Sequence, residues 1–409
     1  MASASAPPFK QDPHKLLVIP GPIEVADEVL FANAHPSMSH VSPDFVPVFG
    51  DCIRMIREVL LTKDAQPFLI SGSGTLGWDQ VAANLVEPGE NALVLNTGYF
   101  GDSFTDCLET YGARVKQLKA PVGGVVPLAD LTAALTAAPK PYKVVTFTHV
   151  DTSTGVLSDA AAIAETVRRV SPSTLVVMDA VCSVASEEIR FDDWDLDVVL
   201  TASQKGLGAP PGLSVLLASQ RAVGVWQARK ESGVREGSYY ASWSKWLPIM
   251  KAYEAGQAAY FATPPVNLIY AFHASLALIT GKKSAQFDDS VALPTLSERF
   301  ALHRAASQRI KSAAFALGLT QLPTDAAHAA NGMSALYFPA GVTAADLLPR
   351  LGARGVIVAG GLLATHKEKY FRIGHMGVSV VDPRRADVET IVKALEGALK
   401  EIEEVKARK

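Results

Sequence analysis

One lysine of the sequence occupies a position where an amine can do chemistry. Lys205 follows the apolar run DVVLTAS at 197–203 and precedes the segment GLGAPPG at 206–212. The run predicts a buried strand, and the glycines and prolines after it cannot continue as a helix. Most lysines are solvated surface residues, so one that a buried strand delivers is unusual. Such an amine is a candidate nucleophile that binds a carbonyl compound as a Schiff base.

A glycine-rich loop supplies a candidate phosphate site. Gly72, Gly74 and Gly77 spell G-x-G-x-x-G between a predicted strand and a predicted helix, which is typical of dinucleotide binding. That function needs an acidic residue at the end of the next strand, where the run ALVLN ends in Asn96 instead. A second explanation is a single phosphate held by N–H groups at the helix start. A third is a tight turn that needs glycine for steric reasons only.

One carboxylate is predicted to reach the same edge of the sheet as the lysine. The run TLVVM at 174–178 delivers Asp179 to the strand ends, where open α/β sheets bind their ligands. Taken alone, this aspartate is better explained as a helix cap or a strand-end turn. Beside a strand-end lysine and a phosphate loop, it fits the partner of a pyridinium nitrogen.

The elements that must position these residues alternate between short apolar runs and amphipathic runs. This pattern predicts a parallel sheet covered by helices. We expect strands at 68–71, 92–96, 143–148, 174–179, 197–201 and 213–217, and helices at 101–111 and 159–170. After an aromatic-rich segment at 239–267 we expect a helical region at 266–318, short strands in SALYF, VIVA and YFRIG, and a final helix at 385–406. The predicted organisation is an N-terminal arm at 1–25, a large domain at 26–265 and a small domain at 266–409.

The composition excludes several classes of protein. The 409 residues are 48% hydrophobic and 19% charged, which is typical of a globular protein. A net charge of −3 argues against nucleic acid as a partner. The three cysteines form no close pair, so neither a disulfide framework nor a zinc pair is expected. The sequence has neither an apolar run of the roughly 18 residues that cross a bilayer nor a signal core. We expect no membrane association and a cytoplasmic protein, with peroxisome and mitochondrion as alternatives.

Six motifs, taken in order, resemble the class V aminotransferase family, and within it the alanine:glyoxylate and serine:pyruvate branch. They are PGP at 20–22, SGSGT at 71–75, HVDTSTG at 149–155, MDAV at 178–181, QKGLGAPPG at 204–212 and FRIGHMG at 371–377. The resemblance covers the chain from about residue 15 onwards. It implies fold type I of the pyridoxal-phosphate-dependent transferases: an α/β fold with a mostly parallel seven-stranded sheet and a smaller α+β C-terminal domain. It also implies pyridoxal 5'-phosphate as cofactor and a homodimer with shared active sites.

The resemblance assigns roles to individual residues. Lys205 forms the Schiff base and then moves the proton of the substrate Cα, and Asp179 pairs with the pyridinium nitrogen. Arg372 binds the substrate α-carboxylate, with Gly21 and Thr152 close to the same substrate. The implied cofactor contacts are Ser73, Gly74, Thr75, Phe100, Thr152, Asp179, Val181, Gln204 and Lys205, completed by Tyr260 and Thr263 of the partner subunit.

Two assignments carry alternatives. Phe100 is expected to stack on the cofactor ring, where relatives often have tryptophan, and neighbouring Tyr99 competes for this role. His35 and His40 suggest a metal site, but no carboxylate lies at ligand spacing, so no metal is expected.

The implied reaction moves the amino group of alanine to glyoxylate, giving pyruvate and glycine, by a ping-pong mechanism. A serine:glyoxylate or serine:pyruvate enzyme is the alternative, because one small pocket can accept both donors. A cysteine desulfurase needs a cysteine in the C-terminal region, whereas the last one here is Cys182. A NAD-dependent dehydrogenase is supported by the glycine loop alone.

Overall fold

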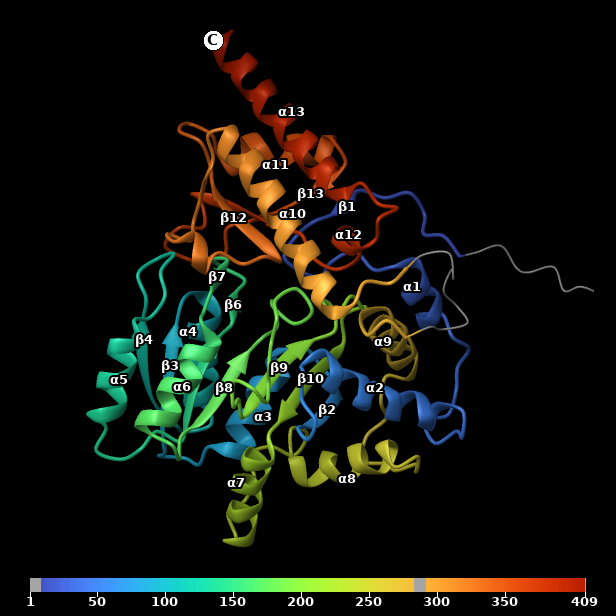
Figure 1. Cartoon of the computed structure of the whole chain (residues 1–409), viewed down its shortest axis with the longest axis vertical. Coiled ribbons are helices and arrows are strands. Elements are labelled where there is room, and N and C mark those ends of the chain that lie inside the picture. The colour runs from blue at the N-terminus through green and yellow to red at the C-terminus, as the bar shows by residue number, and fades with distance from the viewer. Residues whose placement is uncertain (1–8, 283–291, 409) are drawn as a thin grey trace, which may run out of the picture.

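A seven-stranded sheet in the order β2-β10-β9-β8-β5-β3-β4 forms the centre of the larger part of the chain (Figure 1). The computed structural model describes residues 9–282 and 292–408. The pairs from β9 to β4 are parallel, and β10 runs antiparallel to both of its neighbours. The expected mostly parallel seven-stranded sheet is therefore confirmed. Its strands are β2 Gln66–Ser71, β3 Asn91–Asn96, β4 Arg114–Lys119, β5 Val144–Thr148, β8 Leu175–Asp179, β9 Val198–Ala202 and β10 Leu213–Ala218.

Helices cover both faces of this sheet. Every residue of β5, β8 and β9 is buried, and successive side chains of a strand point to opposite faces, so neither face is open to solvent. The expected helices at 101–111 and 159–170 are present as α4 and α6. The helices of this part are α1 Asp27–Asn33, α2 Phe45–Val59, α3 Thr75–Leu85, α4 Tyr99–Thr110, α5 Leu128–Thr136, α6 Ala160–Val170, α7 Gln220–Glu231, α8 Trp243–Glu254 and α9 Val266–Ile279.

A second, smaller unit lies above the strand ends and has its own hydrophobic core (Figure 1). Its antiparallel sheet has the order β11-β12-β15-β14, and helices pack against it. The expected final helix is α13, which extends away from the large unit. The elements are α10 Leu296–Ala316, β11 Thr320–Gln321, a short 3-10 helix Ala326–His328, β12 Met333–Tyr337, α11 Ala344–Ala353, β14 Ala359–Gly360, β15 Tyr370–Gly374, α12 Val378–Val381 and α13 Asp387–Ala407.

Two features of the elements differ from the sequence-based expectation. The run VIVA is divided: β13 Val356–Ile357 pairs in parallel with β1 Leu16–Leu17, whereas β14 joins the small sheet. The predicted helical region at 266–318 contains α9 and α10, and residues 283–291 of that prediction lie outside the described residues. Helix α9 packs on α1 and α2 in the core of the large unit, and the division at 265 stays a prediction.

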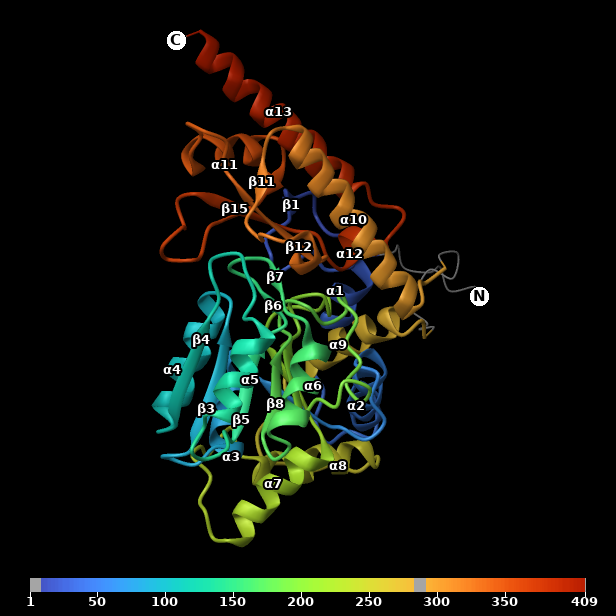
Figure 2. The same cartoon turned by 60° about the vertical axis from the view of Figure 1, so that its left-hand side comes forward.

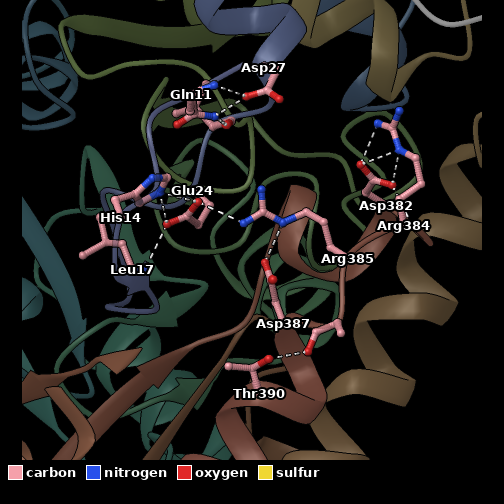
Figure 3. A network of polar contacts seen from close by, with 12 residues as sticks. Gln11, His14, Leu17, Glu24, Asp27, Asp382, Arg384, Arg385, Asp387 and Thr390 are labelled. Carbon is pink, nitrogen blue, oxygen red and sulfur yellow. Dashed lines mark hydrogen bonds and ion pairs between the residues drawn. The ribbon is translucent and has the colours of Figure 1, made fainter. Parts of the chain in front are cut away.

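A buried carboxylate of the N-terminal arm, Glu24, ties the arm to the small unit (Figure 3). Glu24 accepts hydrogen bonds from the Leu17 N–H at 2.8 Å and from Arg385 Nη2 at 3.0 Å. It also lies 3.2 Å from His14 Nε2. The carbonyl of Asp12 and then Glu24 raise the pKa of His14, which favours its charged form beside that carboxylate. Because Arg385 lies two residues before the start of α13, this network holds the arm beside the small unit.

Within residues 9–282 and 292–408, none of the helices has both the length and the apolar character that crossing a bilayer requires.

Candidate active site

A cavity of about 170 Å³ lies at the carboxyl ends of β5, β8 and β9. This is the edge at which parallel strands of open α/β sheets present their ligand-binding groups. Most of the predicted cofactor contacts line it: Ser73, Gly74, Thr75, Phe100, Thr152, Asp179, Val181, Gln204 and Lys205.

Lys205 reaches this cavity from the loop that follows β9. Its side chain is buried, and Nζ donates a hydrogen bond to the carbonyl of Pro20 in the N-terminal arm. Gly21 has φ +110°, and a Cβ atom there would lie 2.5 Å from Nζ, so only glycine permits this approach. Burial lowers the pKa of the Lys205 amine because it penalises the charged form. The structure therefore favours a neutral, nucleophilic amine.

Asp179 ends the neighbouring strand, β8, and is fixed by two hydrogen bonds. Its Oδ2 accepts from Trp78 Nε1 at 2.8 Å, and its Oδ1 accepts from the Val181 N–H at 2.9 Å. Burial raises the pKa of this carboxyl to about 6, and the two hydrogen bonds oppose that shift. At neutral pH a negative charge is therefore available inside the cavity, where a protonated ring nitrogen would pair with it.

The glycine loop joins β2 to the start of α3 and faces the same cavity. A Cβ atom on Gly74 would lie 2.7 Å from Val181 Cγ2, so the loop packs directly on the turn after Asp179. The first amide groups of a helix have no intrahelical partner and stabilise an anion. Gln204 lines the same cavity, and its side-chain NH2 group can donate to a phosphate oxygen. These polar groups fit the phosphate of a cofactor.

Phe100, in the first turn of α4, forms an aromatic wall of the cavity. Neighbouring Tyr99 is 44% exposed and does not line it. The Tyr99 N–H donates to Ser153 Oγ at 3.0 Å, and Ser153 in turn donates its own N–H to Asp151 Oδ1 at 2.9 Å. This chain of bonds fixes the start of α4 and thereby the place of Phe100. The positions favour Phe100 over Tyr99 for stacking on a cofactor ring.

Arg372 belongs to β15 of the small unit and is held beside the cavity by backbone carbonyls. Its Nε donates to the Gly360 carbonyl at 2.8 Å, and its Nη1 donates to the Thr152 carbonyl at 3.0 Å. Burial lowers the pKa of the guanidinium, although an arginine stays charged near neutral pH. A planar cation next to Thr152 suits the carboxylate of a small substrate.

Comparison with known proteins decides the family. The family model described as Aminotransferase class-V matches residues 25–374. The chain belongs to this family. The alanine–glyoxylate aminotransferase 1 of Saccharomyces cerevisiae is 42% identical over 372 residues, which cover 89% of this chain and 92% of the relative. The serine–glyoxylate aminotransferase of Methylorubrum extorquens is 26% identical, with 88% of this chain and 86% of the relative covered.

Solved structures agree with the family assignment. The crystal structure of the alanine–glyoxylate aminotransferase from Nostoc is 28% identical and superposes with a TM-score of 0.82, covering 95% of this chain and 96% of that one. The fold is therefore fold type I, the cofactor of this class V aminotransferase is pyridoxal phosphate, and the dehydrogenase alternative falls. Asn96, where a dehydrogenase would have its acidic residue, instead donates to Asp102 and Gln117 inside the chain.

Two predicted contacts do not reach the cavity of their own chain. Tyr260 is 63% exposed, and neither it nor exposed Thr263 lines the cavity of this aminotransferase. The Tyr260 ring lies 5.1 Å from the ring of His40, and His35 stacks on Tyr270 with ring centres 3.9 Å apart. If Tyr260 and Thr263 contact a cofactor, the cofactor belongs to another chain.

Sequence reasoning missed several groups around the cavity of the aminotransferase. Trp78, Thr148, Val150 and Cys182 line it as well, and Asp151 accepts from Ser153, which in turn holds the start of α4. A signal for Trp78 existed, because residues four apart share one face of a helix and Trp78 follows Gly74 by four. Its indole N–H on Asp179 makes Trp78 part of the candidate site.

Proposed function

We propose that this aminotransferase moves the amino group of alanine to glyoxylate, giving pyruvate and glycine in two half-reactions. The observation that carries the chemistry is the single cavity that joins Lys205, Asp179 and the start of α3. The observation that supports the substrates is the 42% identity to the yeast alanine–glyoxylate enzyme.

Each residue of the cavity has a separate role in the proposed reaction. Burial disfavours the charged form of Lys205 Nζ, which would take the proton from the substrate Cα and later give a proton back to complete the transfer of the amino group. The bound cofactor supplies the electron sink for the Cα carbanion. The negative charge of Asp179 would keep the ring nitrogen of the cofactor protonated, and the Arg372 guanidinium would orient the substrate by binding the substrate's carboxylate. Ser73, Gly74, Thr75 and Gln204 would hold the phosphate, Phe100 and Val181 would enclose the ring, and Gly21 and Thr152 would border the substrate.

Serine is the second candidate donor. The Methylorubrum extorquens relative is named for serine and glyoxylate, and a site that accepts a methyl side chain rejects an added hydroxyl only weakly. A direct comparison of donors is therefore part of the test.

We further propose that the chain works as a homodimer, with Tyr260 and Thr263 of each subunit completing the phosphate site of the other. Tyr239 and Tyr260 are 75% and 63% exposed, and the Tyr239 ring lies 5.5 Å from that of Phe261. Exposed aromatic groups of this kind mark surfaces that a partner covers. We also propose that the chain consists of an arm at 1–25, a large domain at 26–265 and a small domain at 266–409. The proposed location is the cytoplasm, and a fluorescent fusion distinguishes it from the peroxisome and the mitochondrion.

The decisive experiment follows the visible absorption of the purified, cofactor-loaded protein in single turnovers. Alanine without an acceptor should convert the band at 1:1 stoichiometry, and glyoxylate should restore it. Serine and β-alanine are tested in parallel, because β-alanine lacks a carboxylate next to the amino-bearing carbon. In Lys205→Ala, borohydride should no longer link the cofactor covalently to the chain, and the band of the Schiff base should be absent. If serine converted the wild-type band and alanine left it unchanged, serine would replace alanine as the donor.

A further inference from the structure

A buried arginine of the small unit reaches the loops that carry Lys205 and Asp179. Arg299, in the first turn of α10, is 4% exposed. Its Nε donates to the Ala185 carbonyl at 2.9 Å, and its Nη2 donates to the Gly206 carbonyl at 3.0 Å. No carboxylate of the described residues pairs with it. Burial lowers the pKa of Arg299 to about 10, so the guanidinium is still charged at neutral pH. Figure 2 shows α10 running from the small unit down toward the strand ends.

The two carbonyls belong to the two loops that matter for the chemistry. Gly206 directly follows Lys205, and Ala185 lies in the turn that follows Asp179. The loops touch, because a Cβ atom on Gly206 would lie 2.2 Å from the Val184 carbonyl oxygen. Ala185 has φ +62°, a left-handed conformation that costs a non-glycine residue energy and needs support from its surroundings. Arg299 therefore bridges the two loops at their contact.

The other three carbonyls from 204 to 207 have different partners. The Gln204 carbonyl accepts from the Ile23 N–H at 3.2 Å, and the Lys205 carbonyl accepts from the Gly208 N–H at 2.7 Å. The Leu207 carbonyl accepts from Ser275 Oγ of α9. Of the carbonyls from 204 to 207, that of Gly206 is the one held from the small unit, and Arg299 holds it.

We propose that Arg299 is a positioning residue of the aminotransferase, which fixes Lys205 relative to Asp179 by holding the Gly206 and Ala185 carbonyls together. The proposal rests on the cofactor roles given above for Lys205 and Asp179. Arginine suits the task because its rigid planar fork spans two acceptors, whereas the single ammonium of a lysine cannot. Desolvating a guanidinium that has no carboxylate partner among the described residues is expensive, so its burial here needs a reason of this kind.

Arg299 acts through the backbone rather than through its charge. The charged groups that act on the Lys205 amine are those of Arg372 and Asp179, together with the Cys182 thiol. Arg299→Lys, which keeps the positive charge but loses the planar guanidinium, should therefore behave like Arg299→Met, which loses both. This expectation separates a geometric role from an electrostatic one.

The test compares Arg299→Lys and Arg299→Met with Arg304→Met, an exposed arginine of the same helix. Five quantities are measured: the pH midpoint of the visible band of the bound cofactor, the cofactor Kd, kcat and KM for the amino donor, and the Tm. Both Arg299 variants should lower kcat at least about tenfold, because a small misplacement of a reacting group is costly. The midpoint should move and the cofactor Kd should rise, while KM changes little because Arg372 is untouched. Arg304→Met should match the wild type in all five.

A second variant tests the loop contact if Arg299→Met does not fold. Gly206→Ala forces the two loops apart without touching α10 and should move the midpoint as Arg299→Lys does. A lower Tm with an unchanged midpoint, Kd and kcat in Arg299→Lys would overturn the proposal and leave Arg299 as a structural anchor only. The midpoint and the cofactor Kd need no amino donor, so a wrong donor assignment leaves this test intact.

Discussion

Asp179 shows how one side chain is tuned by opposing effects. Burial favours its neutral form and raises its pKa to about 6, whereas the N–H groups of Val181 and Trp78 favour the carboxylate. The ring nitrogen of the cofactor needs the carboxylate, so each hydrogen bond that stabilises the charge widens the pH range of activity. Trp78 is the partner that a substitution can remove.

Trp78→Phe should move the acid limit of activity upward. Without the indole N–H, the pKa of Asp179 rises above its present value, so the carboxylate is lost at a higher pH. We expect kcat/KM to fall about fivefold at pH 6 if the pKa rises by one unit from about 6, and to recover as the pH increases. Profiles of kcat/KM and of cofactor Kd against pH check this expectation.

The matched control for Trp78→Phe is Phe104→Leu. Phe104 stacks on Trp78 with ring centres 5.4 Å apart but makes no hydrogen bond to Asp179. It should lower the Tm without moving the acid limit. An acid limit that is the same in Trp78→Phe and in the wild type would show that the indole does not tune Asp179.

Motifs located the main candidate residues, but contacts between side chains could not be predicted. Lys205 and Asp179 were found because strand ends and loop residues leave a local pattern in the sequence. The bond from Trp78 to Asp179 joins residues 101 positions apart and depends on side-chain direction. The choice between Phe100 and Tyr99 also needed the structure, because it depends on how the first turn of α4 is oriented.

The same holds for the secondary-structure elements. Strands buried on both faces leave a recognisable apolar run in the sequence, whereas partly exposed edge strands do not. Strands β5, β8 and β9 were predicted from continuous apolar runs. Strand β4, with the sequence RVKQLK, was missed because it lies at the edge of the sheet and is only half buried. The division of VIVA between two sheets follows from the pairing of β13 with the distant β1, which no local pattern reveals.

Asp197 anchors the sheet at the edge opposite the cavity. It is 1% exposed and accepts from the Val176 N–H at 2.6 Å, from Arg168 Nη2 at 2.7 Å and from Arg221 Nε at 2.7 Å. The carboxylate thereby links β8 and β9 to α6 and α7.

Asp197→Asn should destabilise the fold by about 3 kcal/mol, because it leaves two guanidinium groups without their buried partner. Urea unfolding of the cofactor-free protein measures the free energy, and the visible band of the loaded protein should be unchanged. Asp195→Asn is the control, since Asp195 pairs with the same Arg168 but has a side chain 66% exposed. It should cost less than about 1 kcal/mol. Equal losses in the two variants would contradict the importance of the buried partner.

At the scale of the whole molecule, the single chain leaves its site incomplete if Tyr260 and Thr263 contact the cofactor. Both are exposed and lie outside the cavity of their own chain. In a homodimer with twofold symmetry, each subunit lends its pair to the other. Each active site then combines Lys205 of one subunit with Tyr260 and Thr263 of its partner.

This arrangement makes a quantitative prediction for mixed dimers. One inactive chain carries Lys205→Ala, and a second carries Tyr260→Ala with Thr263→Ala. A mixed dimer gathers both defects in one site and leaves the other intact. Random pairing of equal amounts makes half of the dimers mixed, so the preparation should regain roughly a quarter of the wild-type activity. If Tyr260 and Thr263 served their own chain, every site of a mixed dimer would be damaged, and activity after mixing would stay at the average of the two variants.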